Sequence, residues 1–279
     1  MAFATVNFYS LALRRTVDVN VVLPTDKRLD GTEVLNYQQP CKTLYLLHGL
    51  FGDHNDWVHG TRLQALANDY GLCVVMPSGD NSFYVDAPGY GRKYSTFISE
   101  ELVRFTRNTF RLSEKREDTF IGGLSMGGFG SLVNGLKHPE TFGAICALSS
   151  ALIKDAIVNA TDDPPTELHA FTAGEYAATF GLANVKDYAG SEWDYDAIAE
   201  KMAGKDPKPR IYMSCGTEDS LFPANVAFKD RLIRLGYDVT WEADPGNHEW
   251  SFWDSHIERS LNWLPLGPAV KGVSSENVL

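Results

Sequence analysis

The chain has 279 residues and carries 25 Lys and Arg against 36 Asp and Glu, which gives a formal net charge of −11. This acidic balance leaves no basic stripe to neutralise phosphates, so we expect neither a nucleic-acid partner nor an anionic membrane surface. No stretch has the apolar length of a membrane span, and the N-terminus lacks the cationic segment of a signal peptide. Four scattered cysteines show no metal-ligand spacing, which predicts buried, reduced thiols and a cytoplasmic protein.

Strand-like and helix-like segments alternate along the chain. Residues 4–9 and 15–23 alternate apolar and polar side chains and predict an antiparallel pair, followed by a polar loop through Pro40. Helical spacing over 97–110 predicts a helix that buries Ile98, Leu102, Phe105 and Thr109 along one stripe. Further strands are predicted at 43–47, 72–76, 118–122, 142–148, 209–214 and 237–242, and further helices at 62–70, after residue 125, at 224–235 and at 251–264.

One segment interrupts the alternation. Residues 150–208 contain no strand-like run and predict an insertion of short helices over the C-terminal edge of the sheet. Such an insertion is expected to be an active-site lid or a pocket wall, and a surface decoration is the alternative. Residues 265–279 contain Gly, Ser and Pro and predict a flexible tail. The whole chain, 1–279, is expected to form one α/β domain.

The stretch around Ser125 has the form of a nucleophile elbow. Gly123, Ser125 and Gly127 make a Gly-x-Ser-x-Gly turn between a short apolar run and a helical pattern. A serine on such a sharp turn has strained backbone angles, so the side chains two residues before and after it must be nearly absent. The helix N-terminus beneath it favours developing negative charge. An incidental serine in a glycine-rich turn is the alternative, and the density of glycines argues against it.

A serine nucleophile requires a base and a group that orients the base, in the chain order Ser, Asp or Glu, His. Asp219 lies in the turn after a predicted strand, where this order expects a carboxylate. Glu218 is its rival, and the shorter side chain favours Asp219. His248 follows the last predicted strand, whereas His169 lies in the insertion and His256 in the last helix. We therefore predict Asp219 and His248 as the partners of the nucleophile.

The tetrahedral intermediate of acyl transfer requires backbone N–H donors. Met126, which follows the nucleophile, offers one, and Leu50 is the natural candidate for the second, because it follows the strand that ends at His48-Gly49. His48 precedes this oxyanion turn, so it is expected to brace the loop rather than act as the base.

Four motifs carry a family resemblance. They are Leu46-Leu-His-Gly-Leu-Phe-Gly-Asp-His-Asn-Asp-Trp57, Gly122-Gly-Leu-Ser-Met-Gly-Gly-Phe-Gly130, Cys215-Gly-Thr-Glu-Asp219 and His248-Glu-Trp-Ser-Phe-Trp253. Together they resemble the esterase D-like branch of the α/β-hydrolases, and within it most closely the tributyrin esterases and cinnamoyl (feruloyl) esterases. The resemblance spans about residues 7–264. It implies an α/β-hydrolase fold with a mostly parallel sheet flanked by helices, and a serine carboxylesterase for short-chain acyl or phenolic esters. It also implies the triad Ser125, Asp219 and His248, with Leu50 and Met126 as oxyanion donors.

The S-formylglutathione hydrolases are related, and such a hydrolase or a thioesterase is the alternative function. The chain departs from them at Glu249-Trp250, where they tend to carry Ser-Tyr, and it lacks their threonine-cysteine pair after the oxyanion-loop residue. These departures argue against a glutathione thioester as the substrate. A non-catalytic binding module is a further alternative, but it would be indicated by a missing triad member, and none is missing.

Aromatic residues near the catalytic loops are candidates for the substrate pocket. Trp57 and Trp250 are the two we select, ahead of Phe83, Tyr84 and Phe252, and core packing is the alternative for each. The aspartates near these loops have no spacing that demands a metal, so no metal and no cofactor are predicted. The expected partner is a small-molecule ester, and homo-oligomerisation stays open.

Overall fold

The computed structural model describes residues 2–29, 33–34, 40–164 and 170–271. Its centre is an eight-stranded sheet with the strand order β1-β2-β6-β5-β7-β8-β9-β10. These strands are β1 (Ala2–Ser10), β2 (Arg15–Leu23), β5 (Thr43–Leu47), β6 (Cys73–Pro77), β7 (Thr119–Leu124), β8 (Ala144–Leu148), β9 (Arg210–Ser214) and β10 (Val239–Glu242). β1 pairs with β2, and β2 with β6, in antiparallel fashion, while the other pairings are parallel. The mostly parallel α/β sheet predicted from the sequence is confirmed.

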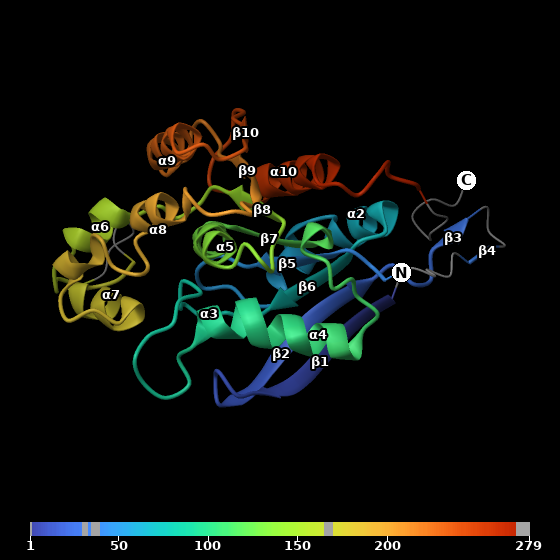
Figure 1. Cartoon of the computed structure of the whole chain (residues 1–279), viewed down its shortest axis with the longest axis horizontal. Helices are drawn as coiled ribbons and strands as arrows, with labels where there is room; N and C mark the ends of the chain where they lie inside the picture. Colours follow the sequence, from blue (N-terminus) through green and yellow to red (C-terminus); the bar gives the residue numbers. More distant parts are fainter. Residues whose placement is uncertain (1, 30–32, 35–39, 165–169, 272–279) are drawn as a thin grey trace.

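Helices cover both faces of the sheet. The α-helices of the described residues, including those of the segment between β8 and β9, are α1 (Asp56–Gly60), α2 (Leu63–Tyr70), α3 (Tyr94–Thr96), α4 (Leu102–Thr109), α5 (Met126–Lys137), α6 (Lys154–Val158), α7 (Ala173–Phe180), α8 (Tyr195–Met202), α9 (Phe222–Arg234) and α10 (Trp250–Trp263). In β5, Leu44 and Leu46 pack with the buried side chains of α2 and α10, whereas Tyr45 and Leu47 pack with those of α4 and α5. Figure 1 shows α2 and α10 together along one side of the sheet. Because both faces are covered, β5 to β8 are buried throughout, as their continuous apolar runs predict.

The segment 97–110 is not one regular helix. A π-helical turn, η1 (Phe97–Glu101), precedes α4. The extra residue in a π turn rotates the face that follows it. The predicted stripe is therefore wrong at its end: Thr109 is exposed, and Thr106 is buried instead, with its hydroxyl 2.7 Å from the Tyr45 hydroxyl.

Two smaller differences concern the loops. Within the predicted polar loop before Pro40, β3 (Arg28–Leu29) and β4 (Glu33–Val34) form a short antiparallel pair. The predicted flexible tail lies partly outside the described residues, which end at 271. Its first part contacts the body of the molecule: Lys42 Nζ donates to Pro265 O at 2.6 Å, and Val270 N donates to Asp69 O at 2.9 Å.

The predicted helical insertion is confirmed. Between β8 and β9, the described residues form α6, α7, the 3-10 turn η3 (Val185–Tyr188) and α8, and no strand. These helices gather at one end of the molecule, at the left of Figure 1. We call residues 150–208 the cap.

The four cysteines are buried and unpaired, as predicted. Burial raises the pKa of the Cys215 thiol to about 12, so this thiol stays protonated near neutral pH. Among the helices of the described ranges, none combines the length and the apolar character that a bilayer crossing demands.

Candidate active site

Ser125 lies at the sharp turn between β7 and α5, with φ +53° and ψ −117°. A residue other than glycine rarely adopts such angles, which cost about 1–3 kcal/mol and persist only where the surroundings enforce them. Here the backbone of Ser125 is held on both sides: its N–H donates to Leu148 O at 2.9 Å, and its carbonyl accepts from Ala151 N at 2.9 Å. The turn sets the side chain at the N-terminus of α5, at the C-terminal edge of the sheet, where parallel α/β folds build their sites.

The glycines of the elbow are required by close backbone contacts. A Cβ atom on Gly127 would lie 2.3 Å from Leu47 O and 2.6 Å from His48 O. A Cβ atom on Gly123 would lie 2.5 Å from the carbonyl of Gly127. The obstacles are backbone atoms of buried elements, which cannot rotate away as a side chain can. Both glycines thus let α5 approach β5 and β7 closely enough to form the turn.

We expect Gly127→Ala to lower the free energy of unfolding by about 3 kcal/mol, because the added methyl group overlaps two fixed carbonyl oxygens. Chemical denaturation of the purified variant measures this. Gly204→Ala is the matched control, since a Cβ atom there meets nothing within 4 Å. Equal stability of the two variants would contradict the requirement for glycine at the elbow.

The structure brings together the three side chains predicted as nucleophile, base and orienting acid. His248 Nε2 lies 3.0 Å from Ser125 Oγ, and His248 Nδ1 lies 2.8 Å from Asp219 Oδ2. The residues come from the turn after β7, the turn after β9 and the loop after β10. Glu218, the rival carboxylate, is exposed, whereas the Asp219 side chain is fully buried.

The environment of Asp219 keeps it ionised. Burial by itself raises the pKa of this carboxyl, but the hydrogen bonds from His248 and from Leu221 N outweigh burial and lower the pKa below its usual value. An ionised Asp219 accepts the Nδ1 proton of His248, which leaves Nε2 free to accept the proton of the Ser125 hydroxyl. The ring of Trp253 packs edge-on against the imidazole, with centroids 4.9 Å apart, and helps to fix its orientation.

Leu50 lies in a tight turn beside the elbow. Gly52 N donates to Gly49 O at 3.3 Å, and Phe51 has a φ of +66°. A hydrogen bond stabilises the strained backbone of Phe51: its N–H donates to Asn81 Oδ1 at 2.8 Å. Leu50 and Met126 both line the same cavity as the Ser125 side chain. Met126 begins α5, where a helix leaves its N–H groups without intrahelical partners.

His48 is buried behind this turn. Its Nε2 accepts from Gly79 N at 2.8 Å, so its Nδ1 carries the proton and donates to Gly49 O at 2.7 Å. Burial lowers the pKa of His48, which therefore stays neutral near pH 7. The Tyr84 hydroxyl donates to the His48 carbonyl at 3.0 Å. These contacts agree with the predicted role of His48 as a brace for the oxyanion turn.

A cavity of about 290 Å³ opens at Ser125. Most of its wall is apolar, and a large share comes from the cap. The lining residues are Leu50, Phe83, Ser125, Met126, Ala151, Ile153, Ala156, Ala170, Phe171, Tyr176, Ser220, Leu221 and His248. Of the aromatic candidates in the sequence, only Phe83 is among them. The sequence did not predict which residues of the cap line the cavity. The position of the insertion after β8 did indicate that the cap could form a pocket wall.

Trp57 and Trp250, the two predicted pocket residues, do not line this cavity. Trp57 is 1% exposed and donates from Nε1 to Leu47 O at 2.9 Å. Trp250 packs edge-on against it, with ring centroids 5.7 Å apart. Trp57 belongs to the core between the sheet and the helices α2 and α10, and the half-buried Trp250 packs against this core. The prediction is corrected for a physical reason: large apolar rings next to the catalytic loops fill the core beneath those loops.

A charged cluster joins the end of β10 and the loop that carries His248 to α10. Within the described residues, Glu242, Asp244 and His256 form the one group with ligand atoms close enough to hold a metal ion. The positive charge next to these carboxylates comes from Arg259. Its Nη1 lies 3.1 Å from Glu242 Oε2 and also contacts Asp244. The cluster therefore ties the loop to α10 through an ion pair.

The sheet, the elbow and the hydrogen-bonded Ser–His–Asp arrangement can be compared with known proteins. The family model described as a putative esterase matches residues 10–264. The chain belongs to this esterase family. It is a carboxylic ester hydrolase, as predicted from the sequence.

Three relatives of this esterase are informative. An acetyl esterase of Caldicellulosiruptor saccharolyticus is 39% identical over 95% of this chain and 98% of its own length. A fluorophosphonate-binding serine hydrolase of Staphylococcus aureus is 29% identical, with a TM-score of 0.80 over 95% of this chain and 98% of that chain. An S-formylglutathione hydrolase of the same organism is also 29% identical, with a TM-score of 0.78 over 95% of this chain and 99% of that chain.

Proposed function

We propose that this esterase hydrolyses esters of short-chain carboxylic acids through an acyl-enzyme intermediate, with Ser125 as the nucleophile, His248 as the general base and Asp219 as the orienting acid. The observation that carries the proposal is the continuous hydrogen-bonded path from Ser125 Oγ through the imidazole to a buried carboxylate, at the mouth of an apolar cavity.

The reaction follows from this geometry. Ser125 Oγ attacks the acyl carbon while His248 Nε2 takes the hydroxyl proton, and Asp219 stabilises the resulting imidazolium. His248 then donates the proton to the leaving alkoxide, which departs as the alcohol and leaves an acyl group on Ser125. A water molecule, deprotonated by His248, attacks this acyl-enzyme. The acid leaves, and the proton returns to Ser125 Oγ.

Leu50 and Met126 are proposed to supply the backbone N–H groups that stabilise the tetrahedral oxyanion. Both residues line the cavity beside Ser125, and the dipole of α5 adds favourable potential at its N-terminus. One such donor contributes about 3 kcal/mol to lowering the barrier in comparable hydrolases. The rigid, strained turn at Phe51 is the kind of support that keeps donors aligned before the substrate arrives.

The preference for short acyl groups rests on the cavity. Its volume of about 290 Å³ lies at the small end of the range for ligand sites, and its wall is mostly apolar. The relative that shares 39% identity is named an acetyl esterase, which agrees with a small acyl group. Phenolic acids of the cinnamoyl type are the next class to test, since Phe83, Phe171 and Tyr176 offer aromatic surface.

Hydrolysis of S-formylglutathione is the second candidate, favoured by the likeness to a hydrolase of that name. Electrostatics argues against it. The chain carries a net charge of −11, and the negative charges of Asp53, Asp56 and Asp80 act to raise the pKa of His48, behind the oxyanion turn, although burial outweighs them. Such a field disfavours a substrate with the net negative charge of glutathione.

A panel of substrates tests the proposal. We expect kcat/KM to be highest for p-nitrophenyl acetate and butyrate, lower for methyl ferulate, and about tenfold or more lower for S-formylglutathione. Repeating the assay at high salt checks the electrostatic argument. Screening should raise kcat/KM for the anionic thioester relative to kcat/KM for the neutral esters. A kcat/KM on S-formylglutathione above that on the short esters would establish the second candidate instead.

We also propose that residues 1–279 form a single catalytic domain, supported by the unbroken sheet from β1 to β10. A single cooperative unfolding transition in denaturant would agree with this organisation.

The four buried, unpaired thiols support the further proposal that the esterase works in the reducing cytoplasm. Localisation of the tagged protein in its own cells tests this.

A further inference from the structure

Helix α6 of the cap forms part of the cavity wall. Ile153 and Ala156, on either side of Lys154, both line the cavity, together with Ala151 just before the helix. Any outward movement of α6 would therefore enlarge the space available to the acyl group. The position of this one helix bears directly on the size of the substrate.

Helix α6 cannot hold that position by itself. It has five residues, Lys154–Val158, and its first residues receive no side-chain capping bond. Isolated helices of this length are not stable in water, because the cost of nucleation exceeds the gain from so few hydrogen bonds. Its position must therefore come from contacts with neighbouring elements.

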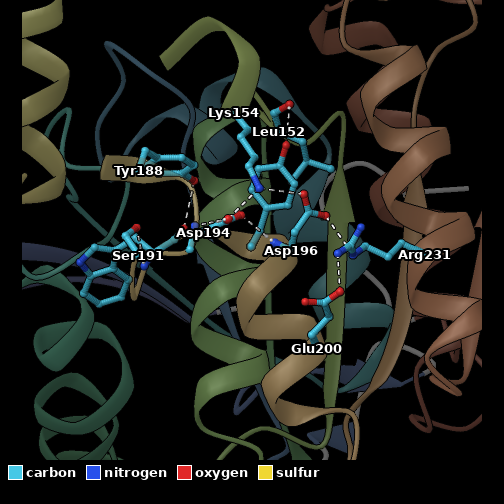
Figure 2. A network of polar contacts seen from close by, with 11 residues as sticks. Leu152, Lys154, Tyr188, Ser191, Asp194, Asp196, Glu200 and Arg231 are labelled. Carbon is cyan, nitrogen blue, oxygen red and sulfur yellow. Dashed lines mark hydrogen bonds and ion pairs between the residues drawn. The ribbon is translucent and has the colours of Figure 1, made fainter. Parts of the chain in front are cut away.

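The strongest polar contact of α6 is an ion pair with the start of α8. Lys154 Nζ lies 2.7 Å from Asp194 Oδ2 and 3.3 Å from Asp196 Oδ2. Figure 2 shows the ammonium group pointing toward both carboxylates. Burial lowers the pKa of Lys154, but the hydrogen bonds and charges of the two aspartates outweigh it and raise the pKa, so the ammonium stays charged.

Asp194 is a fixed anchor for this ion pair. Its side chain is 2% exposed, and it caps α8 by accepting from Asp196 N at 3.1 Å. Its other oxygen also accepts from Gly190 N at 2.7 Å. A buried carboxylate held by backbone donors at two points cannot follow a moving lysine. The ion pair therefore holds Lys154, the first residue of α6, close to this fixed carboxylate.

The same network continues away from the cavity. Asp196 contacts Arg231 of α9 at 3.4 Å, and Arg231 contacts Glu200 at 2.5 Å (Figure 2). The Tyr195 hydroxyl donates to Leu152 O at 3.3 Å, which adds a second link between α8 and the chain just before α6. Glu200 belongs to the network but makes no ion pair with Lys154, and it therefore offers a control for charge removal.

We propose that the Lys154–Asp194 ion pair is a specificity determinant that limits the length of the acyl chain by fixing α6 as a wall of the acyl cavity. This inference rests on the proposed ester hydrolysis at Ser125. Lys154 acts as a positioning residue through Ile153 and Ala156. An intact ion pair keeps the cavity small, and its loss lets the wall yield to a longer chain.

The test is the ratio of kcat/KM on p-nitrophenyl octanoate to that on p-nitrophenyl butyrate. The double variant Lys154→Met/Asp194→Asn removes both charges, so neither is left buried alone, and asparagine remains a good helix N-cap. We expect this ratio to rise about tenfold, mainly through a lower KM for octanoate, as for a pocket that gains room for a few methylene groups. Lys154→Arg, which keeps the charge, should stay near the wild-type ratio, and Glu200→Gln should leave it unchanged.

An unchanged ratio in a folded double variant would overturn the inference, and so would an equal loss of activity on both esters. A similar rise in Glu200→Gln would also overturn it, because general loosening of the cap would then be the cause. These outcomes are separate from failure of the proposed function. In that case the wild-type protein would hydrolyse neither ester, or would hydrolyse them without Ser125.

Discussion

The Ser125→Ala variant should lose at least about 10⁴-fold in kcat on p-nitrophenyl butyrate, because it removes the hydroxyl that lies 3.0 Å from His248 Nε2 and that we propose as the nucleophile. The residual rate should come from the oxyanion donors and substrate binding alone. We expect KM to change little, since the Ser125 hydroxyl occupies a small part of the cavity wall. Stability should also change little, because the elbow is held by backbone hydrogen bonds that alanine retains.

Steady-state kinetics and labelling with a fluorophosphonate probe measure this effect. The wild-type protein should be labelled at Ser125, and the variant should not be labelled at all. Ser255→Ala is a matched control, because it removes a hydroxyl that donates to carbonyl groups of its own helix, α10, and does not line the Ser125 cavity. Retained hydrolysis or labelling in Ser125→Ala would remove the proposed nucleophile.

Replacing Asp219 with asparagine should lower kcat about 10⁴-fold. The asparagine amide can donate to His248 Nδ1, which would favour the tautomer with its proton on Nε2. That tautomer cannot accept the proton of the Ser125 hydroxyl. The variant also removes the negative charge that stabilises the imidazolium in the transition state. The loss should therefore appear in kcat and not in KM.

Glu218→Gln is the control for Asp219→Asn. The two carboxylates are adjacent, but only Asp219 is buried and bonded to the imidazole, whereas Glu218 is exposed. We expect the Glu218 variant to retain the wild-type kcat within about twofold, as for a surface charge outside the site. A large loss in Glu218→Gln with a small loss in Asp219→Asn would reverse the assignment of the orienting acid.

Much of the fold and the candidate site could be predicted because their signals are local in the chain. The Gly-x-Ser-x-Gly turn is specified by residues within a single strand–turn–helix unit, where close backbone contacts leave no room for a Cβ at Gly123 or Gly127. The convergence of Asp219 and His248 on Ser125 could be predicted because each follows a strand of a parallel sheet. The ends of such strands meet at one edge, so chain order alone indicated that their side chains would converge.

Other features could not be read from the sequence because they depend on packing. The apolar pattern of residues 97–110 does not reveal the π-helical turn that moves Thr106 into the core and Thr109 out of it. Aromatic rings next to catalytic loops can line a cavity or fill the core below it, and only the packed structure shows that Trp57 is buried in the core and that Trp250 packs against it.

The sequence by itself determined the sheet, the reaction class and the three side chains that we propose as the triad. Each of these follows from local backbone requirements and from strand order. The tertiary structure alone decided the shape of the acyl cavity and what holds its wall. Lys154 and Asp194 are separated by 40 residues, and each resembles an ordinary surface charge in the sequence. Their ion pair exists only because the folded cap brings Lys154 at the start of α6 next to Asp194, just before α8, in a largely buried environment.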